Sequence, residues 1–91
     1  MRVWVIRNDD TGFFTPGVSA FWFSGAMCHD FSQAMHYHCR GGATTYCNIA
    51  FGRKGKIPSS KQMQNRIDNP HISIVQMEIN SVEIAATKVE W

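Results

Sequence analysis

β-Branched and aromatic side chains concentrate near the two ends of the chain, in runs that predict strands. Residues 2–7 read RVWVIR, with apolar side chains at both odd and even positions, which predicts a strand covered on both faces. Residues 71–79 read HISIVQMEI and give a second strong strand signal. Asn80 and Ser81 then predict a turn or a bulge, after which residues 82–86 either continue or reverse the sheet.

The first strand is followed by residues that favour a tight reversal of the chain. Residues 8–12 read NDDTG, and these residue types tolerate turn geometry and positive φ. Residues 13–15 are expected to return as a second strand that ends at Pro16, so the N-terminus is predicted to form a β-hairpin. Residues 18–24 then predict a third strand, because aromatic and β-branched residues again dominate.

Helix signals occupy the middle of the chain and are separated by glycines. Asp30 is expected to cap a short helical turn over residues 31–35. The glycine pair at 41–42 predicts a break. Residues 43–51 therefore read as a separate helix, closed by Gly52. Four side chains on one face of that helix form a modest apolar stripe: Ala43, Tyr46, Cys47 and Ala50.

The polar stretch between this helix and the C-terminal strand is predicted to be a loop that encloses a short helix. That helix spans residues 60–66, with Ser59 or Ser60 as its cap. Taken together, residues 1–91 predict a single α+β domain. A small antiparallel sheet, made of the N-terminal β-hairpin and the C-terminal strand, packs with one or two short helices.

Composition supports a folded domain in a reducing compartment. Hydrophobic residues make up 44% of the chain and charged residues only 18%, a balance that argues against disorder. The three cysteines cannot all pair within one chain, which favours a cytoplasmic location. Residues 11–29 are long enough to span a membrane, but they carry Pro16, three glycines and several hydroxyl groups. A transmembrane helix or a membrane partner is therefore not expected.

Charge is distributed unevenly along the chain. Residues 31–67 carry six cationic side chains and no acid, a balance of +6, although the whole chain is only +2. Such polarity steers association with acidic partners. Phe21, Trp22 and Phe23 add a surface, because on a strand Trp22 faces away from its two neighbours and one face is left exposed. The candidate partner-binding residues are Arg53, Lys54, Lys56, Lys61, Arg66 and Trp22.

A group of cysteines and histidines offers an alternative metal site. The candidate ligands are Cys28, His36, His38, Cys39 and Cys47. Their spacing matches no common zinc pattern, since there is no C-x₂-C pair, and buried cysteines with hydrogen-bonded histidines are the simpler interpretation. No nucleophile–base signature or phosphate-binding loop is present either, so catalysis and a cofactor are not expected.

The order of these features resembles a group of short bacteriophage proteins. They open with a strand reading V-I-R-N and a D/E-T-G turn, and close with a strand of the I-V-x-[MV]-E-I kind. The matching residues are 5–8, 10–13, 30–34, 42–43 and 74–79, which together with their spacing cover about half of the chain. The resemblance implies a phage origin and a ββ(β)αβ-like fold, and it implies no catalytic residues.

Three function classes follow. The leading expectation, which draws on the resemblance, is a phage-encoded, non-catalytic inhibitor. It would bind a host or antiviral-defence protein or ribonucleoprotein stoichiometrically in the cytoplasm of the infected cell, as anti-CRISPR proteins do. The alternative is a nucleic-acid or nucleotide-signal binding protein that uses residues 53–66. A small zinc-binding domain is the third.

Overall fold

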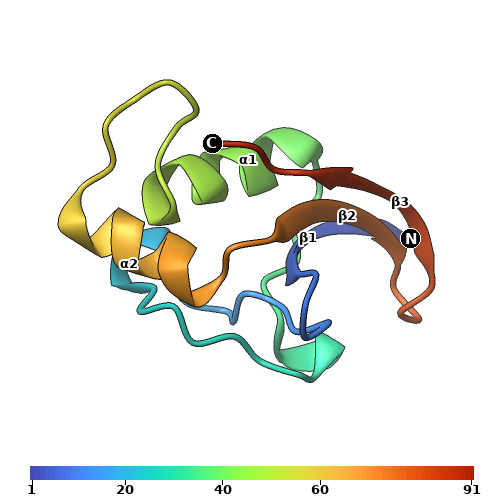
Figure 1. Cartoon of the computed structure of the whole chain (residues 1–91). Helices are drawn as coiled ribbons and strands as arrows, with labels where there is room; N and C mark the ends of the chain where they lie inside the picture. The colour runs from blue at the N-terminus through green and yellow to red at the C-terminus, as the bar shows by residue number, and fades with distance from the viewer.

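The computed structural model describes residues 1–91, arranged as an antiparallel sheet with helices. The strands are β1 (Arg2–Asn8), β2 (Ile72–Glu78) and β3 (Glu83–Lys88), with β2 in the centre of the sheet. The helices are α1 (Arg40–Ala50), α2 (Ser60–Asp68) and two 3₁₀ helices, η1 (Ala20–Trp22) and η2 (Phe31–Gln33). The expected α+β class is confirmed (Figure 1).

The two strands with the clearest sequence signals form the buried heart of the sheet. β1 and β2 pair in antiparallel register along all seven of their residues. Because successive side chains point to opposite faces, Val5 and Val75 enter one buried cluster while Ile6 and Ile74 enter another. The prediction that residues 2–7 form a strand covered on both sides is confirmed.

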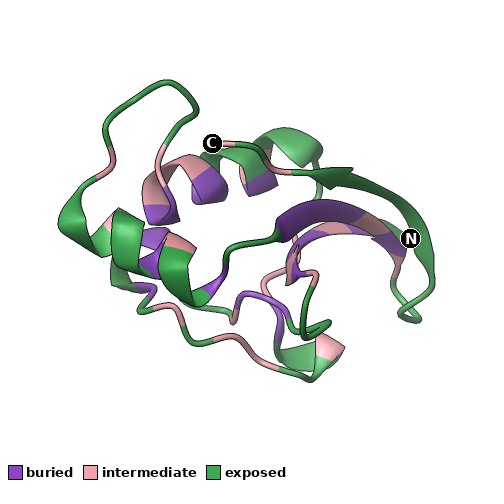
Figure 2. Cartoon of the chain, viewed as in Figure 1, coloured by how far each residue is buried: buried purple, intermediate pink, exposed green.

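β3 differs from its neighbours because every one of its residues is exposed. It pairs with β2 only, after a turn in which Ser81 adopts a φ of 72°. Residues 82–86 were expected either to continue the strand before them or to reverse direction, and they reverse, since β3 runs antiparallel to β2. Figure 2 shows the contrast between the exposed β3 and the buried β2 beside it.

α1 covers one face of the sheet. Its predicted apolar stripe is confirmed, since Ala43, Tyr46, Cys47 and Ala50 are all buried. They pack with Ile6, Ile72 and Ile74 of the sheet and with the rings of Phe23 and Phe51. Residues brought together from four parts of the chain thus form the larger of the two buried clusters, and Phe23 ties η1 to the underside of α1.

The opposite face of the sheet is covered by parts of the irregular chain that follows β1, at residues 14, 28, 31 and 34 (Figure 1). Phe14 and Ala34 from this segment pack on Val5, Val75 and Met77. The predicted return strand at residues 13–15 is reduced to Phe14, which makes isolated bridges to Arg7 and Cys28. The chain does reverse after β1, but the long ladder partner of β1 is β2, because β2 supplies an apolar side chain for each face.

The prediction of a strand at residues 18–24 was wrong. Residues 20–22 form η1 instead, and the outer edge of β1 bonds to Phe14 and Tyr37 rather than to this segment. Asp30 was expected to cap a short turn, and it does so: its carboxylate accepts from the Ser32 backbone at the start of η2.

The expected break at Gly41 and Gly42 was also wrong. Both glycines lie in the first turn of α1, which begins at Arg40. A Cβ on Gly42 would lie 2.8 Å from Cδ1 of Tyr37, so glycine is needed there for the close approach of the helix to that ring. Neither α1 nor any other helix has the length and apolar character required to cross a membrane.

The end of α1 and the start of α2 follow their sequence signals closely. α1 ends at Ala50, and Gly52 then adopts a φ of +89°, a conformation that favours glycine. Ser59 caps α2 in a reciprocal capping box with Gln62, each side chain bonded to the other residue's backbone N–H. These two junctions fix where the chain leaves α1 and where it enters α2.

Candidate binding surface

Two neighbouring aromatic residues of η1 project into solvent. Trp22 is 80% exposed and Phe21 is 69% exposed, whereas Ala20 and Phe23 on either side of them are buried. Here Phe21 and Trp22 are called the aromatic ridge. Residues of this size usually bury most of their surface in an isolated domain, so two of them exposed side by side indicate an interaction surface. A strand would have separated them, and the 3₁₀ turn instead leaves both exposed.

The backbone of the aromatic ridge is held by hydrogen bonds. The Ser19 side chain accepts from the N–H of Phe21, and the Ser19 carbonyl accepts from the N–H of Trp22 at 2.9 Å. From α2, the ammonium of Lys61 donates to the Phe21 carbonyl at 2.7 Å. Phe23, the residue that follows the aromatic ridge, is held by its buried ring, which packs against the rings of Tyr46 and Phe51. The exposed side chains therefore stand on a fixed base.

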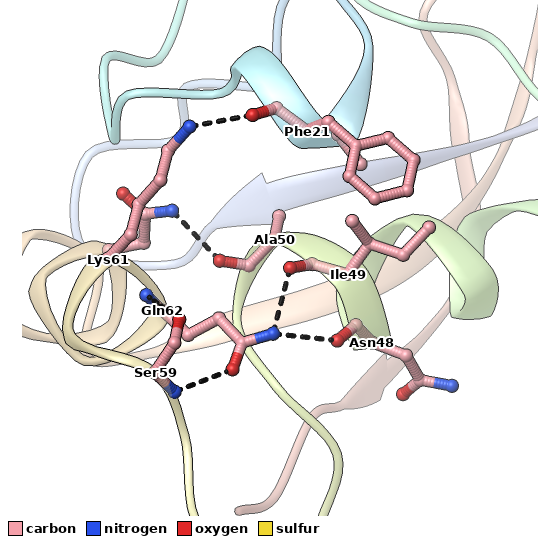
Figure 3. Close-up of a pocket in the computed structure, with 9 residues that line it drawn as sticks. Phe21, Asn48, Ile49, Ala50, Ser59, Lys61 and Gln62 are labelled. Atoms are coloured by element: carbon pink, nitrogen blue, oxygen red, sulfur yellow. Dashed lines mark hydrogen bonds between the residues drawn. The ribbon is translucent and has the colours of Figure 1, made fainter.

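A pocket of about 380 Å³ opens beside the aromatic ridge, and here it is called the ridge pocket. It lies between η1, the last turn of α1 and the first turn of α2, as Figure 3 shows. Its walls include Phe21, Asn48, Ile49, Ser59, Lys61 and Gln62. The volume is at the lower end of the range that small-molecule sites and side-chain pockets occupy.

The polar groups in the wall of the ridge pocket are mostly satisfied within the protein. The Gln62 amide nitrogen donates to two carbonyls in the last turn of α1, and its oxygen accepts from the Ser59 N–H at 2.9 Å. The Asn65 amide donates to the Ala50 carbonyl at 2.8 Å. Side chains of α2 thus satisfy the carbonyls at the end of α1 and hold the two helices in place, which fixes the shape of the pocket.

Two polar groups in the ridge pocket retain unused hydrogen-bonding capacity, and one aromatic ring is exposed beside them. The Lys61 ammonium has three N–H donors, of which the Phe21 carbonyl takes one. The carboxamide of Asn48 makes no hydrogen bond within the protein, and the Phe21 ring is open to solvent. Figure 3 shows these side chains coming from three different elements around the pocket. The site offers a cation, an amide and an aromatic surface.

Residues 53–56, here called the basic loop, form a separate exposed feature. Arg53, Lys54 and Lys56 are all exposed, and the loop is closed by a hydrogen bond from the Lys56 N–H to the Arg53 carbonyl at 3.2 Å. Lys54 lies 3.4 Å from the carboxylate of Glu90, while Arg53 and Lys56 have no acidic partner. The loop precedes α2 in the chain, and none of its residues lines the ridge pocket.

Arg66, the remaining predicted contact residue, is engaged in packing within the protein. Its Nε donates to the Phe51 carbonyl, and its guanidinium carbon lies 5.0 Å from the centre of the Trp91 ring. That ring in turn stacks on Phe51, at 5.7 Å between centroids. Arg66 therefore joins α2 to the end of α1 and the C-terminal residues, and only Lys61 of the predicted cations lines the ridge pocket.

The candidate metal ligands are dispersed by the fold. Cys47 lies on the buried face of α1. Cys28 packs against the cluster on the other face of the sheet, and the ring of His36 bonds to the Phe31 carbonyl. Burial raises the pKa of Cys47 to about 12 and also raises the pKa of Cys28. His38 and Cys39 are exposed. No three His, Cys, Asp or Glu side chains lie together as a metal site would need, so the zinc alternative has no assembled ligand set.

Comparisons of the chain with protein-family models, with curated proteins and with solved structures find no match. The functional assignment therefore rests on the residues themselves. Sequence reasoning missed Phe21, Asn48 and Gln62 as neighbours around one pocket. The S-x-x-Q spacing of Ser59 and Gln62 was a signal for the capping box, but nothing in the sequence placed that box against the end of α1.

Proposed function

We propose that this chain is a non-catalytic binding protein that engages a protein partner through the aromatic ridge and the adjoining cations. In its narrower form the proposal follows the resemblance to short phage proteins. The chain is then a phage-encoded stoichiometric inhibitor of a host or antiviral-defence protein or ribonucleoprotein, acting in the cytoplasm of the infected cell. No cofactor takes part.

The observation that carries the proposal is the exposure of Phe21 and Trp22 on a rigid turn. Tryptophan is among the residues that contribute most to binding energy at protein interfaces. A pre-ordered anchor also loses little conformational entropy when a partner covers it. That order is supplied in the free protein by the Ser19 hydroxyl, which accepts from the Phe21 N–H, and by the Lys61 ammonium, which donates to the Phe21 carbonyl.

The test is affinity capture with matched baits. Wild-type protein, Trp22→Ala and Val82→Ala are immobilised and exposed to lysate from bacteria that carry antiviral-defence systems. Val82 is a suitable control because it is also an exposed apolar residue but lies in the turn between β2 and β3. A partner retained in stoichiometric amount by wild type and Val82→Ala, and lost with Trp22→Ala, is expected. Absence of any stoichiometric partner on wild type, or equal retention by all three baits, contradicts the proposal.

A second candidate function is supported by the unpaired cations of the basic loop. Arg53 and Lys56 are exposed and have no acidic partner, as phosphate-contacting residues often are. Titration of labelled single- and double-stranded oligonucleotides and cyclic dinucleotides at two salt concentrations tests it. Phosphate contacts predict that log K falls by about 0.7–0.9 per neutralised phosphate as log salt rises. Flat titrations at low salt would remove this candidate.

A further inference from the structure

We infer that the ridge pocket receives an acidic side chain of the protein partner, so that the partner presents an aspartate or glutamate beside an apolar surface. The inference rests on the proposed function and names the chemistry that the partner must bring. It uses the ammonium of Lys61, which keeps free N–H donors, and the apolar wall that Phe21 and Ile49 give to the same pocket.

The charge in the pocket selects for an anion. Lys61 has no acidic partner, and its single intramolecular hydrogen bond goes to a neutral carbonyl. It lies in the first turn of α2, where no acidic residue offsets the partial positive charge of the helix N-terminus. The nearest ion pair of the adjoining loop, Lys54 with Glu90, does not include it. The positive charge of Lys61 is therefore left for a group from outside the chain.

The number of cations favours a carboxylate over a nucleic-acid backbone. A strand of nucleic acid presents a row of phosphates and is met by several cations along a groove. Lys61 is the only cationic residue that lines the ridge pocket. Arg66, the one arginine of α2, instead donates to the Phe51 carbonyl and packs over the Trp91 ring. One ammonium matches one carboxylate.

Hydrogen bonds within the protein also fix the shape of the pocket before a ligand binds. Gln62 and Asn65 bond to carbonyls of α1, so the polar wall does not compete for the incoming carboxylate. The apolar part of the wall, Phe21 and Ile49, shields the ion pair from water once the aromatic ridge is covered. An ion pair from which water is excluded in this way is stronger than an ion pair on an open surface.

The test uses a random peptide library displayed on yeast and selected against the wild-type protein. Selected peptides are expected to carry Asp or Glu next to apolar residues. A fluorescent selected peptide is then titrated against wild type, Lys61→Met, Lys61→Arg and Lys88→Met. Lys88 is an exposed lysine on β3, so Lys88→Met controls for the change in net charge. Lys61→Met is expected to weaken binding about tenfold or more, while Lys61→Arg and Lys88→Met stay close to wild type.

Several results would overturn the pocket assignment. They are selected peptides without acidic residues, equal effects of Lys61→Met and Lys88→Met, or an oligonucleotide that binds through Lys61 more tightly than any selected peptide. A Trp22→Ala variant, titrated in parallel, separates the two levels of the inference. Peptides that depend on Trp22 but not on Lys61 leave the proposed binding function standing and remove only the acidic pocket. Peptides that depend on neither residue remove both.

Discussion

The aromatic ridge and the basic loop are both exposed, but they are built in different ways. The ridge lies in a 3₁₀ turn whose backbone accepts one hydrogen bond from Lys61, and the residue that follows the turn, Phe23, is 1% exposed. The basic loop contains one internal backbone hydrogen bond, between Lys56 and Arg53, and a single exposed ion pair. One surface is pre-ordered and apolar, and the other is loosely tied and charged.

Under the proposed function, this difference predicts different parts in binding for the two regions. A rigid aromatic surface contributes affinity, because little order is lost when it is covered. Loosely held cations contribute mainly to the rate of encounter and to its dependence on salt. Substitutions at the ridge should therefore act on dissociation, and substitutions in the loop should act on association. Four variants test this comparison, from the largest expected effect to the smallest.

Phe23→Ala removes the base of the aromatic ridge and should have the largest effect. The Phe23 ring packs against Tyr46 and Phe51, with centroids 6.1 and 5.5 Å away. Truncation of a buried phenylalanine costs about 3–5 kcal/mol of unfolding free energy. Urea denaturation followed by circular dichroism measures this loss. A change below about 1 kcal/mol would show that the ridge does not depend on the core beneath it.

Gly52→Ala tests the junction between α1 and the basic loop. The φ of Gly52 is +89°, and an added Cβ would lie 2.8 Å from Nη2 of Arg66 and 3.2 Å from Oε1 of Gln62. The backbone strain alone costs about 1–2 kcal/mol. Thermal denaturation should therefore show a lower melting temperature than wild type. A matched control is Gly55→Ala, which has the same kind of φ but no neighbour within 4 Å and should cost less.

Reversal of all three loop charges, with Arg53, Lys54 and Lys56 changed to Glu, should leave the fold intact. Substitutions on an exposed loop shift stability by less than about 0.5 kcal/mol each. Association with the partner should slow by about tenfold at low salt, with little change in dissociation. Surface plasmon resonance at two salt concentrations, together with the melting temperature, measures both. Unchanged association and stability would mean that the loop only connects α1 to α2.

Ser19→Ala should have the smallest effect on stability and act locally on the aromatic ridge. It removes the side chain that accepts from the Phe21 N–H at 3.4 Å, a long and exposed bond. Loss of such a cap costs about 0.5 kcal/mol, at the low end of capping effects. Hydrogen exchange at the Phe21 amide should become faster while exchange in β2 stays the same. Unchanged exchange at Phe21 would show that Lys61 and Phe23 alone hold the turn.

The sequence determined those elements whose signals are local. Apolar residues at both odd and even positions specified β1 and β2, because each face of a buried strand needs its own set of side chains. Gly52, Ser59 and Gln62 specified where α1 ends and α2 begins, because capping depends on residues within one turn. The stripe from Ala43 to Ala50 specified the buried face of α1 for the same reason.

Only the tertiary structure decided which segment pairs with β1 and which conformation the exposed aromatic residues adopt. Residues 13–15 had the composition of a strand, but β2 took the place beside β1 because it buries apolar side chains on both faces at once. Residues 18–24 had strand propensity as well, but residues 20–22 became η1, and the outer edge of β1 is bonded by Phe14 and Tyr37 instead. The ridge pocket joins residues from three elements far apart in the chain, so no local pattern could place Lys61 next to Phe21.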